Sequence, residues 1–309
     1  MVRVDLITGF LGAGKTTFLR GYLKYLQEQG ERVRIIENEF GEVDVDSQLL
    51  ADEHAEIADL TGLCMCCIGK EAFIKLLIAS SRDHACDRIV VEPSGIYDVD
   101  EFFEVMTLPQ VAECCEIGSI ITIADPMGID YLAEEAQYLL FAQLLASGVV
   151  IMSKTQFLQE AELEAAVEKY HSLMRKFGCE NGLISDLCIK PWSEFTEDDY
   201  EEFSDAFYHR MIHDREEFSH GDTFRSTAVI AHAANLEDLK SRVCTNFNSP
   251  SCGWIYRIKG YVQTKQGTWY EVNCTGETES IRPVPEAEDS ILVVIGQNLR
   301  EREIKEMWK

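Results

Sequence analysis

The stretch Gly9-Phe-Leu-Gly-Ala-Gly14-Lys15-Thr16-Thr17, near the N-terminus, follows the pattern G-x-x-x-x-G-K-[ST] of a phosphate-binding loop. An apolar run, residues 2–8, precedes it, and residues 16–28 follow it with apolar side chains at helical spacing. A position between a strand and a helix is the context that this motif requires, because backbone N–H groups can then surround phosphate oxygens at the positive end of the helix. The stretch therefore predicts a nucleotide-binding α/β fold.

The residue types of the loop suit a nucleoside triphosphate with Mg²⁺. Lys15 can neutralise charge on the β and γ phosphate oxygens, and Thr16 can place its hydroxyl on Mg²⁺. We expect both residues to serve hydrolysis as well as binding. The loop residues predicted to contact the nucleotide are Gly9, Gly12, Ala13, Gly14, Lys15, Thr16 and Thr17.

Strand-like and helical stretches alternate after the loop, which predicts a P-loop NTPase domain with a mostly parallel sheet and helices on both faces. The expected strands are residues 33–37, 88–91, 117–124 and 149–152. Near Pro191 the pattern changes, and residues 196–212 are acidic and predicted to be helical. We assign residues 1–190 to the NTPase domain, 191–222 to a linker and 223–309 to a small C-terminal α+β domain.

The composition restricts the class of function. The 309 residues carry 28 basic and 54 acidic side chains, a formal net charge of −26. This charge argues against a nucleic-acid partner, because a protein that binds nucleic acid needs a basic face. The simplest interpretation of the charge is an acidic solvated surface. No apolar run approaches the roughly 20 residues of a membrane span, and no signal peptide is evident. We therefore expect a cytoplasmic protein that binds no membrane and whose eleven cysteines are mostly reduced. The oligomeric state is left open.

Glu92 and Gly95 follow the expected strand 88–91 and complete the predicted phosphate site. Glu92 stands where a carboxylate can hold Mg²⁺, although it could instead cap the following turn. Gly95 could let the backbone approach the γ-phosphate.

The segment Ser153-Lys154-Thr155-Gln156 follows the expected strand 149–152, where guanine-specific proteins carry N-K-x-D or a variant. In that motif the lysine stem stacks on the base and the aspartate accepts two hydrogen bonds from guanine. Gln156 stands in place of the aspartate, and its NH₂ group presents a donor where a second acceptor is wanted. We expect Ser153, Lys154 and Gln156 to lie at the base, with guanine preference weakened or moved to other residues.

A second motif, Cys64-Met65-Cys66-Cys67, indicates a thiolate site for a transition metal. Three thiolates leave one tetrahedral position open, which suits a metal that must be handed on. A redox pair or plain burial is the alternative for an isolated C-x-C-C pattern. Most of the other eight cysteines are expected to be small core residues.

The acidic segment Glu37-Asn38-Glu39-Phe40-Gly41-Glu42 lies between the two motifs. Glu37 and Glu42 could complete the thiolate site or serve Mg²⁺, and a solvated acidic loop is the alternative. A loop that senses both phosphate and metal would let hydrolysis change metal affinity.

These motifs together resemble one family, the CobW-type GTPases, which are relatives of the urease and hydrogenase nickel-insertion GTPases. The resemblance rests on the phosphate loop, Asn38-Glu-Phe-Gly-Glu42, Cys64-x-Cys66-Cys67, Glu92-x-Ser94-Gly95, Ser153-Lys154-Thr155, Trp254-Ile-Tyr-Arg-Ile-Lys-Gly260 and Val293-Val294-Ile295-Gly296. It implies a GTPase metallochaperone that holds Zn²⁺, or Co²⁺ for corrinoid metabolism, on Cys64, Cys66 and Cys67. A client metalloprotein or a corrinoid-related enzyme is the implied partner.

The chain departs from the family pattern at three places. Gln156 replaces an aspartate, and Leu63 replaces the glycine that usually precedes the cysteines. In place of a histidine-rich loop the chain offers His209, His213 and His220, of which the first two have i,i+4 spacing on an expected helix. They could bind metal weakly, but ordinary exposed histidines are the simpler interpretation.

Two other classes of function fit the phosphate loop. A small-molecule kinase would need an acceptor pocket and has no use for thiolates. A nucleotide-dependent switch would dock a client protein through the C-terminal domain.

Overall fold

The chain is described by a computed structural model that covers residues 1–38, 56–59, 70–82, 86–182, 185–209, 224–276, 278–287 and 289–309, with only the backbone given for 38, 56–59 and 82. These residues form two compact units, one up to residue 209 and one from residue 224. Each unit has its own sheet and its own hydrophobic core.

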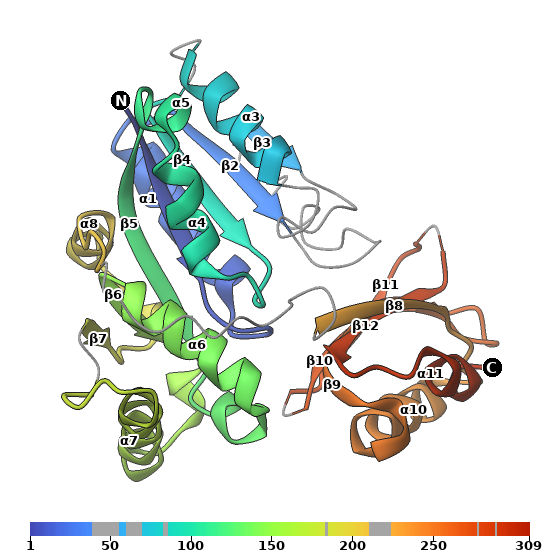
Figure 1. Ribbon diagram of the computed structural model, residues 1–309. Coiled ribbons are helices and arrows are strands. Elements are labelled where there is room, and N and C mark those ends of the chain that lie inside the picture. The colour runs from blue at the N-terminus through green and yellow to red at the C-terminus, as the bar shows by residue number, and fades with distance from the viewer. Residues whose placement is uncertain are drawn as a thin grey trace. The chain divides into compact units, whose positions relative to one another are not determined.

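The first unit is built on a seven-stranded sheet with the strand order β3-β2-β4-β1-β5-β6-β7 (Figure 1). All neighbouring strands are parallel. The strands are β1 (Val2–Thr8), β2 (Val33–Asn38), β3 (Glu56–Asp59), β4 (Arg88–Pro93), β5 (Cys115–Ala124), β6 (Val149–Met152) and β7 (Asp186–Cys188). The carboxyl ends of parallel strands meet at one edge, so the loops after these strands gather there.

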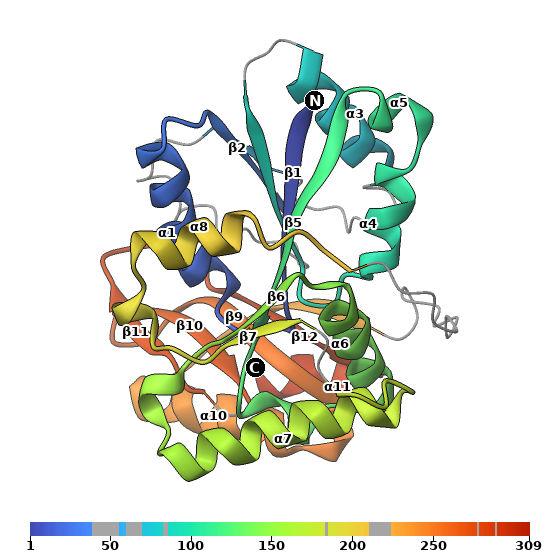
Figure 2. The same ribbon diagram turned by 90° about the vertical axis from the view of Figure 1, so that its left-hand side faces the viewer.

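Helices cover both faces of this sheet. Figure 2 shows α1 and α8 on one side of β1 and β5, and α3, α4 and α5 on the other. The helices of the unit are α1 (Lys15–Glu28), α3 (Lys70–Arg82), α4 (Val99–Met106), α5 (Pro109–Ala112), α6 (Glu134–Ala146), α7 (Glu160–Lys176) and α8 (Glu197–Ser204), with short 3₁₀ turns η3 (Gly128–Tyr131), η4 (Thr155–Phe157) and η5 (Trp192–Glu194). The predicted P-loop domain with a parallel sheet covered on both faces is confirmed.

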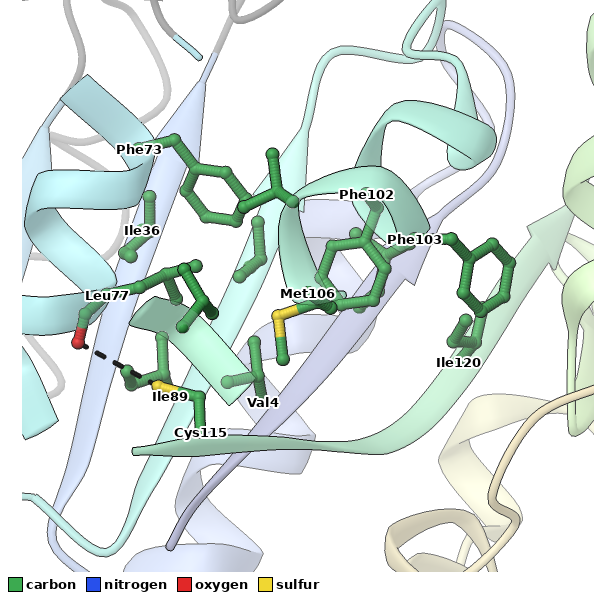
Figure 3. Packing of buried hydrophobic residues seen from close by; sticks show 14 of the residues in the cluster. Val4, Ile36, Phe73, Leu77, Ile89, Phe102, Phe103, Met106, Cys115 and Ile120 are labelled. Atoms are coloured by element: carbon green, nitrogen blue, oxygen red, sulfur yellow. Dashed lines mark hydrogen bonds between the residues drawn. The ribbon is translucent and has the colours of Figure 1, made fainter. Parts of the chain in front are cut away.

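Successive side chains of a strand point to opposite faces of the sheet, which divides the core into two layers. Ile36 and Val91 pack with α3, α4 and α5, whereas Ile35 and Val90 pack with α1 and α8. Figure 3 shows the first layer, where Phe102 and Met106 of α4 and Phe73 and Leu77 of α3 lie over the strands. A sheet buried on both faces gives the near-continuous apolar runs from which the strands were predicted.

The stretch assigned to a linker begins with residues that pack on the first unit. Trp192 and Phe195 contact the core layer under α1, and Phe203 of α8 is buried in it. Thr196 caps α8 together with Asp199, and the helix ends at Ser204 rather than continuing toward residue 212. The domain ranges 1–190, 191–222 and 223–309 stay predictions. Residues 192–204, however, pack on the core of the first unit as part of that domain.

The second unit is an antiparallel sheet with the strand order β11-β10-β9-β12-β8. Its elements are β8 (Phe224–Ile230), α10 (Leu236–Asn248), η6 (Pro250–Cys252), β9 (Trp254–Gln263), β10 (Trp269–Thr275), β11 (Ile281–Val284), β12 (Ile291–Gln297) and α11 (Glu301–Met307). Leu239 of α10, Ile304 of α11 and Trp308 pack with strand residues in a single core. The predicted small α+β domain is therefore confirmed.

Candidate functional site

The phosphate loop connects β1 to α1 in a conformation that needs glycine. Gly9, Gly12 and Gly14 have φ angles of 132°, 75° and 101°. At Gly9 there is also no room for a side chain, because an added Cβ would lie 2.2 Å from the carbonyl oxygen of Ile123. Gly14 is the residue that caps the N-terminus of α1. The loop therefore places backbone N–H groups at the positive end of a 14-residue helix, the arrangement that binds phosphate.

The Lys15 side chain is buried within this loop. Its Nζ donates to the carbonyl oxygens of Gly9 at 3.1 Å and Phe10 at 3.4 Å. Phosphate oxygens are stronger acceptors for an ammonium group than neutral carbonyls are. Lys15 is thus held where the loop would enclose a phosphate.

Two of the predicted Mg²⁺ residues are brought together. The Thr16 hydroxyl donates to Glu92 Oε1 at 2.9 Å, which joins the first turn of α1 to the carboxyl end of β4. Glu37 is the register partner of Glu92 on the neighbouring strand β2, and both side chains are buried. A hydroxyl and a carboxylate are hard oxygen ligands, so this pair fits Mg²⁺.

Gly95 closes the site from the segment after β4. A Cβ at Gly95 would lie 2.4 Å from Leu11 N and 2.6 Å from the carbonyl carbon of Phe10. The segment after β4 therefore packs directly against the phosphate loop, and a side chain at position 95 would push the two apart.

The predicted base segment follows β6. Ser153 is buried and donates through its backbone N to the Ala124 carbonyl at 2.9 Å. Lys154 has a positive φ of 56°, and Gln156 lies exposed in η4. The ion pair between Lys154 Nζ and the Asp125 carboxylate fixes the lysine.

Two residues of this region carried no functional prediction. Asp125 follows β5, and besides Lys154 it accepts a hydrogen bond from Met127 N at 3.1 Å while its carbonyl accepts one from Tyr170 OH at 2.8 Å. Trp192 lies beside Gly14, as Ser153 does. The sequence signal for Asp125 was its place at the end of an apolar strand, whereas Trp192 offered none because only the fold brings it to the loop.

The predicted transition-metal residues fall mostly outside the described residues. Cys64, Cys66, Cys67 and Glu42 belong there, as do Leu63, His213 and His220, so their roles stay predictions. Within the described ranges no group of three or more His, Cys, Asp or Glu residues could hold a metal ion.

The eight cysteines outside the cluster are free thiols in the described chain. Burial raises the pKa of Cys115 to about 12 and that of Cys274 to about 11. Both thiols therefore stay protonated at neutral pH, and a protonated thiol is a poor ligand and a poor nucleophile. Cys244, in contrast, is exposed.

Among the helices of the described residues, none combines the length and the apolar character needed to cross a membrane.

Two family profiles match the chain. Residues 3–177 match the CobW/HypB/UreG nucleotide-binding domain, and residues 231–309 match the cobalamin synthesis protein cobW C-terminal domain.

The chain is also similar to curated proteins named as zinc chaperones. It is 33% identical to YjiA of Escherichia coli over 171 residues, 52% of each chain. It is 31% identical to YeiR of the same organism over 155 residues, 50% of this chain and 47% of YeiR. CobW of a Sinorhizobium species is 27% identical over 299 residues, 84% of this chain and 81% of that protein. The chain thus spans about half the length of the first two relatives. A crystal structure of Zn(II)-bound YjiA GTPase aligns with 99% of this chain and 97% of that one at 20% identity, with a TM-score of 0.41.

Proposed function

This chain belongs to the CobW/HypB/UreG family of nucleotide-binding proteins, and from this premise we propose that it is a GTP-hydrolysing metallochaperone. Nucleotide binding and hydrolysis would control the binding of a divalent transition metal and its delivery to a client protein. The observation that carries the nucleotide half is the Thr16–Glu92 hydrogen bond beside a glycine-rich loop, since it assembles hydroxyl, carboxylate and phosphate cradle in one place.

The chain's own residues would bind and orient the nucleotide. Lys15 and the loop N–H groups would hold the β and γ phosphates, and Thr16 and Glu92 would hold Mg²⁺. When bound, Mg²⁺ supplies neutralisation of phosphate charge. Lys154, fixed by Asp125, would lie along the base, with Ser153 and Gln156 beside it.

We propose Zn²⁺ as the metal cargo, held by Cys64, Cys66 and Cys67 with Glu37 and Glu42 nearby. The relatives named zinc chaperones favour zinc, and Co²⁺ delivered to a corrinoid-related enzyme is the alternative. Glu37 supports a link between the two sites, because it lies beside Glu92 on the sheet and directly precedes the segment leading to the cysteines. The client metalloprotein and the cytoplasmic location belong to the same proposal.

The decisive experiment measures release of free phosphate from GTP while Zn²⁺ is titrated to stoichiometry. We expect Zn²⁺ to change the turnover rate, and Cys66→Ala to abolish that change. Cys244→Ala is the matched control, since this thiol is exposed and lies in the second unit. A GTP turnover rate that stoichiometric Zn²⁺ leaves unchanged in the wild type would refute the coupling of hydrolysis to metal binding.

The phosphate-release assay and a pull-down together separate the competing classes. A kinase would yield a phosphorylated acceptor in place of free phosphate. A docking switch without metal coupling would capture its client in a nucleotide-dependent pull-down and show no response to Zn²⁺.

A further inference from the structure

Four aromatic residues between β7 and the end of α8 hold α1 against the sheet. We call Trp192, Phe195, Tyr200 and Phe203 the aromatic clasp. Trp192 and Phe203 meet Phe18 of α1 with ring centroids 6.2 Å and 5.9 Å away. Phe195 packs on Tyr200 at 5.7 Å and on Phe203 at 5.3 Å, which joins these three rings, and Phe18 connects Trp192 to them. Such pairs contribute roughly 0.5–1.5 kcal/mol each beyond their burial, so the clasp is a firm support for the first turns of α1.

Tyr200 contacts α1 one to two turns further along the helix. Tyr200 stacks on Tyr25 at 5.8 Å, and its hydroxyl fills the space beside Gly21, where an added Cβ would lie 2.2 Å from the oxygen. Trp192 is therefore one end of an extended contact, the end nearest to the phosphate loop.

Trp192 also touches the phosphate loop itself. A Cβ built on Gly14 would lie 2.9 Å from Cη2 of Trp192, 3.6 Å from its Cζ3 and 3.8 Å from Cβ of Ser153. The benzo edge of the indole ring and the Ser153 side chain thus limit the space beside Gly14. Gly14 is the N-cap of α1 and has a left-handed φ of 101°. Its conformation sets the direction in which the first N–H groups of the helix point.

We propose that Trp192 is a nucleotide-positioning residue, which holds Gly14 in the conformation that the phosphate-bound loop requires. A glycine has more backbone freedom than any other residue, so an unsupported Gly14 would lose more entropy when the loop closes on phosphate. A ring held by Phe18 on one side and placed against Gly14 on the other restricts that freedom before the ligand arrives. The inference rests on the proposed nucleotide site and adds a residue to it from outside the recognised motifs.

The role predicts a separation of binding from turnover. In Trp192→Ala we expect the Kd for a non-hydrolysable GTP analogue with Mg²⁺ to rise about 10-fold. Without the ring, the loop becomes ordered only when the nucleotide binds, and the entropy lost then weakens the affinity. We expect kcat at saturating GTP to change far less, since Thr16 and Glu92 are untouched. Trp192→Phe, which keeps a ring, should recover most of the affinity.

A second readout does not depend on hydrolysis. Energy transfer from tryptophan to bound mant-GTP should fall strongly in Trp192→Phe. It should persist in Trp254→Phe, a control at an exposed residue of the second unit. Circular dichroism of each variant checks that the chain is folded.

Two results would overturn the proposal. One is an unchanged Kd in a folded Trp192→Ala protein, and the other is energy transfer in Trp192→Phe that is as strong as in the wild type. Failure of the metallochaperone function would look different, because GTP turnover would then ignore Zn²⁺ while these nucleotide titrations still gave the expected values.

Discussion

The sheet of the first unit holds two groups of buried and partly buried polar residues on the face that carries α1, one at the start of the helix and one further along it. The stabilising network consists of Asp5, Tyr22, Glu31 and Arg88. Arg88 donates to Asp5 Oδ2 at 2.7 Å and to both Glu31 oxygens at 2.6 Å and 3.0 Å, and Tyr22 OH donates to Asp5 at 2.8 Å. The loop group is Lys15, Thr16 and Glu92 beside the phosphate loop.

The surroundings of the two groups suit different roles. In the stabilising network, acid and base meet directly: burial lowers the pKa of Arg88, but its bonds to Glu31 and the charge of Asp5 raise that pKa by more. At the loop, Lys15 donates to the carbonyl oxygens of Gly9 and Phe10, and Glu92 accepts from the Thr16 hydroxyl, beside backbone N–H groups suited to phosphate. The first arrangement stabilises the fold, and the second is suited to a ligand.

The largest effect is expected from breaking the stabilising network. Arg88→Met leaves Asp5 buried without its cation, and removal of one partner of a buried pair costs about 3–5 kcal/mol of unfolding free energy. Urea denaturation without nucleotide measures this loss. Arg32→Met, which breaks the exposed pair with Asp87, is the control and should cost at most about 1 kcal/mol. A loss from Arg88→Met no larger than the control would contradict the assignment.

The next effect is expected at the loop and should appear in binding, not in stability. Lys15→Ala removes the cation that meets the phosphates and should weaken nucleotide affinity about 10-fold to 100-fold, because a hydrogen bond between charged groups is worth about 1.5–3 kcal/mol. Isothermal titration calorimetry measures the affinity, with Lys24→Ala on the exposed side of α1 as control. If Lys15→Ala instead lowers the unfolding free energy as much as Arg88→Met does, the division between the two groups fails.

A smaller effect concerns the choice of base. Gln156→Asp restores the acceptor that a guanine-reading motif uses, and a good bidentate contact to a base is worth about 1–3 kcal/mol of discrimination. The ratio of ATP to GTP dissociation constants should therefore rise about 10-fold to 100-fold in this variant. Gln156→Glu, which places a carboxylate at the length of glutamine, tests whether the shorter side chain of aspartate is needed. An unchanged ratio would show that the base is read elsewhere.

The smallest effect is a pH dependence at the surface. Hydrogen bonds from Arg32 lower the pKa of Asp87 to about 2, below the unfolded value of roughly 3.9. The folded state then binds fewer protons, so the contribution of the pair is complete above about pH 4 and is lost as the pH falls toward 2. Because the pair is half-exposed, Asp87→Asn should cost at most about 1 kcal/mol at pH 7. Urea denaturation of wild type and variant should converge at low pH, and a gap that widens there would reverse the sign.

The sequence was informative where a local pattern carries the chemistry. The strand, loop and helix around Lys15 follow a fixed spacing, and Glu92 was found because it ends a buried apolar strand. The short strands β3, β7 and β11 have three or four residues each, too few for a periodic signal. Their existence depends on pairing with longer neighbours.

Residues placed by tertiary packing were missed. Trp192 follows a proline in an acidic stretch and read as the start of a linker, because nothing local shows that its ring reaches Phe18 and Gly14. Asp125 directly follows the expected strand 117–124, but its pairing with Lys154 joins segments 29 positions apart. The register of β5 against β6, which places these two residues together, exists only in the folded sheet.

The central claim is that phosphate and metal sites are coupled, and the Zn²⁺ affinity of each nucleotide state tests it most directly. A competition titration with a chromophoric chelator would measure the Kd for Zn²⁺ with bound GDP and with a non-hydrolysable GTP analogue, both with Mg²⁺. We expect the two constants to differ by about 5-fold to 150-fold, the usual range of coupling between sites, and Cys66→Ala to remove the difference. Equal Zn²⁺ affinities in the two nucleotide states would contradict the account.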